Sequence, residues 1–174
     1  MGERITNEAE RLFMKVMSRR CRNVSKSTME EDMFQHFDVV CDEIKYEVKG
    51  DKKMSMGDDF FTDVYWIELV NVNGDPGWVK GKADYIAFKH KEEFYIIDRA
   101  ELENLTEKLV KDRTVYRIKQ YCKIYQRVGR KDQVTYLDFS DIRLLIKEVI
   151  KIEKQDYEGI DSNQTGNDLQ EGSK

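Results

Sequence analysis

Apolar and charged residues alternate strictly over residues 44–49, and this run most restricts what the chain can form. Alternation with a period of two is typical of a β-strand that buries one face. Glu47 and Lys49 then share the polar face, about 7 Å apart along the strand. Asp38 lies in the preceding apolar segment, residues 34–41, which we expect to form the neighbouring strand of a hairpin.

Two carboxylates beside one ammonium group suit the metal-dependent hydrolysis of phosphodiesters. Asp38 and Glu47 would bind Mg²⁺, which prefers hard oxygen ligands and keeps several waters. A bound metal lowers the pKa of its water, while Lys49 would orient that water or shield the oxyanion. The alternative is an ordinary solvated strand face, because 37% of the residues are charged. We therefore treat Asp38, Glu47 and Lys49 as candidate catalytic residues.

The spacing Asp-x8-Glu-x-Lys resembles the active-site signature of the PD-(D/E)XK nuclease superfamily, with similarity to Holliday junction resolvases. The likeness covers about residues 5–150 and includes 46–51, 66–68, Gly77 and 82–85, as in a small phage-type branch. Phe37 stands where the proline of the motif would be. The resemblance implies an α/β (α+β) fold, with a restriction-endonuclease-like mixed central sheet flanked by helices. It also implies a Mg²⁺ cofactor, for which Mn²⁺ would substitute, and the backbone carbonyl of Val48 as a third metal ligand.

Two further glutamates are candidate auxiliary residues. Apolar residues recur at helical spacing over residues 6–20, with Glu8 at the edge of the apolar stripe and Glu10 opposite it. Superfamily members often carry a glutamate on this helix that reaches the metal, so we favour Glu8, although acids are also common in a first helical turn. Glu68 lies inside an apolar strand, where a carboxylate needs a cation, a partner or water.

Charge is distributed unevenly along the chain, although the net charge is only −4. Residues 108–131 contain nine basic residues and one acidic residue. Such a one-signed segment is either a solvated face or a contact for a polyanion. We expect it to bind nucleic acid, DNA in the first place with RNA as the alternative, through Lys123, Arg127, Arg130 and Lys131. Residues 155–174 are acidic and polar, which predicts a disordered tail after a domain over residues 1–154.

The composition of this 174-residue chain fits one soluble domain, with 40% hydrophobic residues and a single proline. No apolar run is long enough for a membrane span. Cys21, Cys41 and Cys122 form no Cys-x-x-Cys pair, so we expect reduced thiols and a cytoplasmic location.

Local patterns predict the order of the elements. We expect a helix over 6–20, a loop over 21–32, strands over 34–41 and 44–50, a loop over 51–59 and a strand over 64–72. A hairpin over 83–88 and 94–97, a helix capped by Asp98, a strand over 134–139 and a last helix capped by Ser140 follow. Residues 115–128 fit both helical and strand patterns.

The sequence thus predicts a Mg²⁺-dependent endonuclease acting on DNA; the similarity to junction resolvases implies branched DNA as one candidate substrate, with linear DNA as the other. A homodimer would be needed to cut two strands. The alternative is a catalytically inactive factor of a phage that keeps the nuclease fold and binds nucleic acid or protein.

Overall fold

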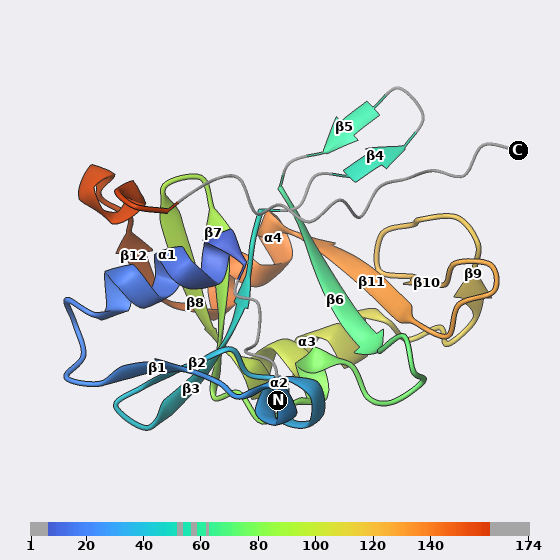
Figure 1. Ribbon diagram of the computed structural model, residues 1–174. Coiled ribbons are helices and arrows are strands. Elements are labelled where there is room, and N and C mark those ends of the chain that lie inside the picture. The colour runs from blue at the N-terminus through green and yellow to red at the C-terminus, as the bar shows by residue number, and fades with distance from the viewer. Residues whose placement is uncertain (1–6, 52–53, 57–58, 62, 161–174) are drawn as a thin grey trace, which may run out of the picture.

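The computed structural model describes residues 7–51, 54–56, 59–61 and 63–160, which form an α+β protein (Figure 1). In this part of the chain the strands form a six-stranded sheet (β1-β2-β3-β7-β8-β12), a four-stranded sheet (β6-β11-β10-β9) and the pair β4-β5. The strands are β1 (Val24–Lys26), β2 (Val39–Cys41), β3 (Ile44–Lys49), β4 (Met54–Met56), β5 (Asp59–Phe61), β6 (Val64–Val70), β7 (Tyr85–His90), β8 (Glu93–Asp98), β9 (Val115–Tyr116), β10 (Ile124–Tyr125), β11 (Gln133–Asp138) and β12 (Ile146–Lys151). The helices are α1 (Glu8–Met17), α2 (Met29–Gln35), α3 (Arg99–Leu109) and α4 (Phe139–Ile142), with 3₁₀ turns η1 (Trp78–Lys80), η2 (Arg143–Leu145) and η3 (Lys154–Tyr157).

The six-stranded sheet is mixed, because β3 runs parallel to β7 while its other neighbouring strands pair antiparallel. The predicted hairpin of β2 and β3 is confirmed, with Val39 opposite Tyr46. The alternation along β3 is also confirmed on its apolar side, where Tyr46 and Val48 are buried.

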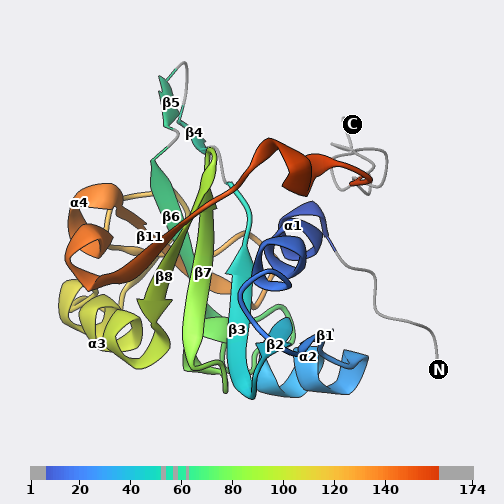
Figure 2. The ribbon, with the colours of Figure 1, turned by 90° about the vertical axis from the view of Figure 1, so that its left-hand side faces the viewer.

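Two apolar cores lie on the two faces of this sheet. Helix α1 packs Leu12, Phe13 and Val16 against one face. The other face packs against α3 and the four-stranded sheet through a core that includes Ile67, Ile86 and other buried residues. Figure 2 shows the arrangement, with α1 on one side of β3 and β7 and α3 on the other. No helix in the described residues is long and apolar enough to cross a bilayer.

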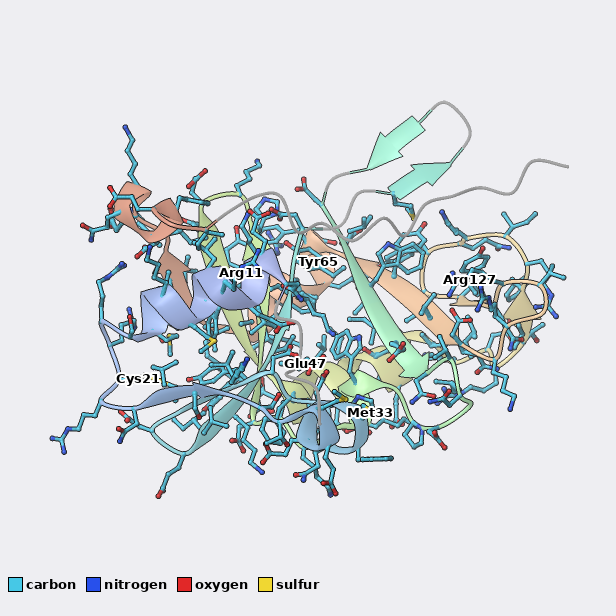
Figure 3. The ribbon with its side chains drawn as sticks, in the orientation of Figure 1. Arg11, Cys21, Met33, Glu47, Tyr65 and Arg127 are labelled. Carbon is cyan, nitrogen blue, oxygen red and sulfur yellow. A yellow bond between two sulfur atoms is a disulfide. The ribbon has the colours of Figure 1, made fainter. Side chains whose placement is uncertain are left out.

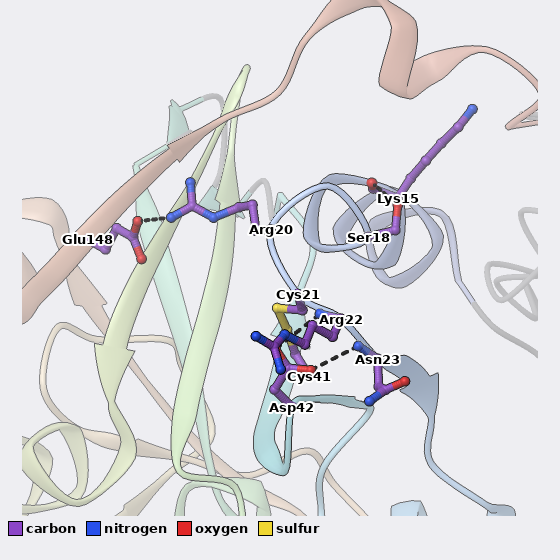
Figure 4. Close-up of a disulfide and its surroundings, with 9 residues drawn as sticks. All are labelled: Lys15, Ser18, Arg20, Cys21, Arg22, Asn23, Cys41, Asp42 and Glu148. Carbon is purple, nitrogen blue, oxygen red and sulfur yellow. Dashed lines mark hydrogen bonds and ion pairs between the residues drawn. A yellow bond between two sulfur atoms is a disulfide. The ribbon is translucent and has the colours of Figure 1, made fainter.

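A disulfide joins Cys21, just after α1, to Cys41 at the end of β2 (Figure 4). The two Cα atoms are 6.0 Å apart, a separation that a disulfide normally spans. Beside it, Asp42 accepts hydrogen bonds from the backbone N–H groups of Arg22 and Asn23, at 3.1 and 2.9 Å. The expectation of three reduced thiols is therefore wrong for this pair, and Cys122 is the free cysteine.

Four predicted elements differ from the structure. Residues 29–35 form α2 rather than the end of the expected loop and the start of the expected strand, because Thr28 and Glu31 make a reciprocal capping box. The predicted last helix is reduced to α4, capped by Asp138 rather than Ser140, and the apolar residues that follow form β12. Residues 21–32 contain β1 as well as the expected loop, and the loop expected over 51–59 contains β4 and the first residue of β5.

The predicted tail begins later than expected. Lys154–Tyr157 form the turn η3, in which Asp156 is 1% exposed and forms an ion pair with Arg19. Tyr157 and Ile160 pack against the core beneath α1. The chain thus belongs to the domain through residue 160, and residues 161–174 of the predicted tail lie outside the described residues.

Candidate active site

Glu47 and Lys49 meet on the polar face of β3, as the alternation predicts. The Lys49 Nζ forms an ion pair with Glu47 Oε1, and it lies 4.9 Å from the centroid of the Trp78 ring. Glu47 is 3% exposed, whereas the side chain of Lys49 is 26% exposed. Trp78 is buried in the core, as favoured for a tryptophan. The Glu47 carboxylate is thus buried, and the more exposed Lys49 ammonium group lies between it and solvent.

Asp38 approaches the same pair from the residue just before β2, since the strand expected over 34–41 begins only at Val39. Its Oδ2 accepts a hydrogen bond of 2.7 Å from the backbone N–H of Val48, and its own N–H donates to the carbonyl of Tyr46 at 2.8 Å. Continuing the β2–β3 register by one residue places Asp38 opposite Glu47. Asp38 is buried, and its negative charge acts on Lys49. The three predicted catalytic residues are therefore brought together.

The electrostatics of this group are those of buried carboxylates around one cation. Burial alone would lower the pKa of Lys49, but the carboxylates of Glu47, Asp38 and Glu68 outweigh it and raise that pKa. Burial raises the pKa of Glu47, against the opposing effect of Lys49, and the negative charges of Asp32 and Glu10 add to the rise. Lys49 is therefore held in its charged form, whereas Glu47 gains a proton more readily than an exposed glutamate.

The glutamate of α1 that reaches this region is Glu10, not Glu8. Glu8 is exposed, whereas Glu10 is 4% exposed and its charge is felt by Glu47. The reason is the helix cap: Asn7 accepts a 3.0 Å hydrogen bond from the N–H of Glu10, and the Asn7 amide donates back to the Glu10 carboxylate. This reciprocal contact turns the Glu10 side chain back toward Asn7. A helical wheel does not include such contacts, so it places Glu10 on the outer face.

Glu68 is held at the same site by a close approach of two backbones. Its Oε2 accepts a 3.4 Å hydrogen bond from the N–H of Trp78, and the N–H of Gly77 donates to the carbonyl of Leu69 at 3.0 Å. A Cβ atom on Gly77 would lie 2.3 Å from the carbonyl oxygen of Glu68, so only glycine fits there. The predicted auxiliary role of Glu68 is thus consistent with its position.

Glu47, Lys49 and Glu68 line a cleft of about 710 Å³ between the two large sheets, and Asp38 and Glu10 are buried outside its lining. Glu47, Val48 and Lys49 line the wall formed by the six-stranded sheet, and β6, β10 and β11 supply the other wall. Figure 3 shows Glu47 near the middle of the molecule and Arg127 farther along the four-stranded sheet, in the segment around β10.

The basic segment contributes to the cleft only in part. Of the four predicted nucleic-acid contacts, Arg127 lines the cleft. Lys123 instead pairs with Asp112 at 3.3 Å, Lys131 donates to the carbonyl of Asn73 at 3.4 Å, and Arg130 is exposed outside the lining. Lys119, which the sequence did not single out, lines the cleft as well.

A divalent cation fits the residues at the bottom of the cleft. Within the described residues, no group of three or more His, Cys, Asp or Glu side chains is arranged around a common point. Mg²⁺ needs fewer, since proteins commonly hold it by one or two carboxylates and waters. Glu47 Oε2 is buried without a hydrogen-bond partner among the described residues, and its raised pKa reflects the burial that a cation would offset. Asp38 and Glu47 are the residues that would hold the ion.

Comparisons of the chain with models of protein families, with curated proteins and with solved structures found no match.

Proposed function

We propose that this protein is a metal-dependent endonuclease that hydrolyses DNA phosphodiester bonds, with a restriction-endonuclease-like fold of the PD-(D/E)XK type and a preference for branched DNA. The observation that carries the proposal is the cluster of Glu47 and Lys49, which line the cleft, with Asp38 buried behind them; Lys119 and Arg127 line the same cleft. Each chain supplies one such cluster, so cutting two strands would require a homodimer.

The residues divide the work as follows. Asp38 and Glu47 hold the metal, with the Val48 carbonyl as a further oxygen ligand. The metal supplies a water of lowered pKa and charge neutralisation at the phosphate. Lys49 has a raised pKa and stays protonated, so it donates hydrogen bonds to the attacking water or to a phosphate oxygen. This favours a role in orientation and charge stabilisation over one as a general base.

The test is incubation with supercoiled, linear, single-stranded and four-way-junction DNA in Mg²⁺, Mn²⁺ or EDTA. We expect cleavage in either metal, none in EDTA, and the fastest reaction on the junction. Lys49→Ala should slow cleavage by about a hundredfold or more while leaving DNA affinity nearly unchanged. Lys82→Ala, at an exposed lysine outside the cleft, is the matched control. A Lys49→Ala protein that cuts at the native rate would rule out the proposal.

The alternative is a nuclease-fold protein that binds nucleic acid without cutting it. The favouring observation is that the described residues contain no preformed cluster of three or more metal-ligating side chains. Salt-dependent DNA binding with no cleavage in any metal would establish it. Arg127→Ala should then flatten the salt slope of log K by about one unit, whereas Arg130→Ala should change it little.

A further inference from the structure

The four-stranded sheet presents an aromatic face to the cleft. Tyr65, Ile67 and Leu69 of β6 point into the core, so the alternate residues Trp66 and Glu68 point the other way. Cross-strand pairing places Tyr136 beside Trp66 on that face, with ring centroids 5.5 Å apart.

Tyr125 extends this face onto β10, since it pairs with Val134, which in turn pairs with Glu68. Its ring centroid is 6.5 Å from that of Trp66, and the two ring planes meet at 51°. Trp66 and Tyr125 both line the cleft and are partly exposed. The two rings are tilted rather than stacked on each other. Trp66 also packs against Met54, Val64 and Tyr136, so the surface open to a flat ligand is the partly exposed part that lines the cleft.

Cations border these rings. The Lys119 Nζ lies 6.0 Å from the Trp66 centroid, at the outer limit of a cation–π contact. The guanidinium of Arg127 donates to Asp132 Oδ2 from Nε at 3.2 Å and from Nη2 at 2.7 Å. Asp132 is 6% exposed, so it fixes the orientation of an arginine that is itself half exposed. The site thus offers aromatic surface with two cations beside it, Lys119 and the Arg127 guanidinium that Asp132 holds in place.

We propose that Trp66 and Tyr125 form a base-stacking subsite, which holds an unpaired nucleotide of DNA or RNA beside the phosphate at Glu47 and Lys49. This inference rests on the proposed function, because it uses the same cleft. Trp66 and Glu68 are two residues apart on one strand, about 7 Å. The charge of Glu68 acts on Lys49, so the rings lie on the same strand as a residue that reaches the proposed phosphate site.

The chemistry of the rings selects unpaired over paired bases. In a duplex both faces of each base are covered by its neighbours, and only the edges are accessible in the grooves. Aromatic side chains therefore stack on bases that have left the helix or never entered it. Because every base has such a face, the subsite should tolerate any sequence, while Lys119 and Arg127 contact phosphates.

The chain contains two tryptophans, Trp66, which is partly exposed in the cleft, and Trp78, which is buried beside Lys49 at the cleft wall. This difference in exposure allows a direct test. Trp78→Phe leaves Trp66 as the reporter, and Trp66→Phe leaves Trp78 as the matched control. Each full-length variant is titrated in EDTA with oligo-dT, with oligo-U and with a blunt duplex of equal length. We expect single strands to quench Trp66 fluorescence, and the duplex to leave it almost unchanged. The Trp78 ring is buried and cannot stack on a base, so the Trp78 reporter should be quenched by single strands much less than the Trp66 reporter.

Binding is then measured for Trp66→Leu, which removes the ring, alongside Trp66→Phe, which keeps a smaller one. Single-strand affinity should fall about tenfold or more in Trp66→Leu and less in Trp66→Phe. Equal quenching by duplex and single strand, or unchanged affinity in Trp66→Leu, would overturn the inference. Quenching by single strands without cleavage in any metal would uphold the subsite and reject the nuclease. Cleavage without quenching of Trp66 would support the nuclease and reject the stacking subsite. Comparing oligo-dT with oligo-U tells which nucleic acid is preferred.

Discussion

Replacing Lys49 by methionine should destabilise the protein in a way that depends on pH. Methionine keeps the side-chain stem against Trp78 but leaves the carboxylate of Glu47 buried without its cation. Removing one partner of a buried ion pair costs about 3–5 kcal/mol. Because the Lys49 side chain is 26% exposed and water screens part of the interaction, we expect a loss of about 2–3 kcal/mol near pH 8.

The sign of the pH dependence follows from the raised pKa of Glu47. A carboxyl group whose pKa is higher in the folded state binds its proton more tightly there, so its contribution to stability falls as the pH rises above the ordinary glutamate pKa. Lys49→Met removes the ammonium group that lowers the pKa of Glu47. In the variant this pKa therefore rises further, and the loss of stability at high pH is larger. Near pH 5, where the variant's Glu47 can be protonated, the loss should shrink to about 1 kcal/mol.

Urea unfolding at both pH values measures this effect. The double variant Glu47→Gln/Lys49→Met should recover most of the stability lost by Lys49→Met near pH 8, because the buried charge is gone. Lys82→Met, at an exposed lysine, serves as the control and should change stability by less than about 0.5 kcal/mol. An equal loss for Lys49→Met at the two pH values, or a double variant less stable than the single one, would refute the reasoning.

Three other perturbations have defined outcomes. Mg²⁺ should raise the Tm more near pH 8 than near pH 5, because Glu47 must lose its proton to bind the ion, and Glu47→Gln should abolish the shift in a thermal melt. Cys21→Ala should lower the unfolding free energy by about 3 kcal/mol, as expected for opening a loop of 20 residues; a reductant should reproduce this fall in the native protein and have no effect on the variant. Asp156→Ala should lower the unfolding free energy in urea by about 2 kcal/mol, because Arg19 loses the carboxylate with which it forms an ion pair. Glu158→Ala, at an exposed position, should be nearly neutral.

The sequence predicted elements well where a local signal agreed with the packing. The alternation in β3, the hairpin of β7 and β8, and the helix capped by Asp98 are all confirmed. Each of them is specified by neighbours within a few residues, which the sequence shows directly.

The errors arose where two local patterns competed or where contacts were distant. Residues 146–150 fit a helical spacing, but isoleucine and valine there also suit a strand, and pairing with β8 decides the outcome. The capping box of Thr28 and Glu31 is a local signal in the sequence that the expected loop over 21–32 overlooks. The Cys21–Cys41 bond and the inward turn of Glu10 depend on tertiary neighbours and on a cap contact, which neither spacing nor a helical wheel contains.

The two walls of the cleft come from separate hydrogen-bonded sheets that share no strand among the described residues. Asp38, Glu47 and Lys49 depend on the β2–β3 hairpin, while Trp66, Tyr125 and Arg127 depend on strands that join the other sheet. Glu68 of β6 links the two walls, because its charge acts on Lys49. Substitutions at Trp66, Tyr125 or Arg127 therefore leave the pairing of β2 with β3 intact, and under the proposed function they would alter what the cleft binds rather than the group around Lys49.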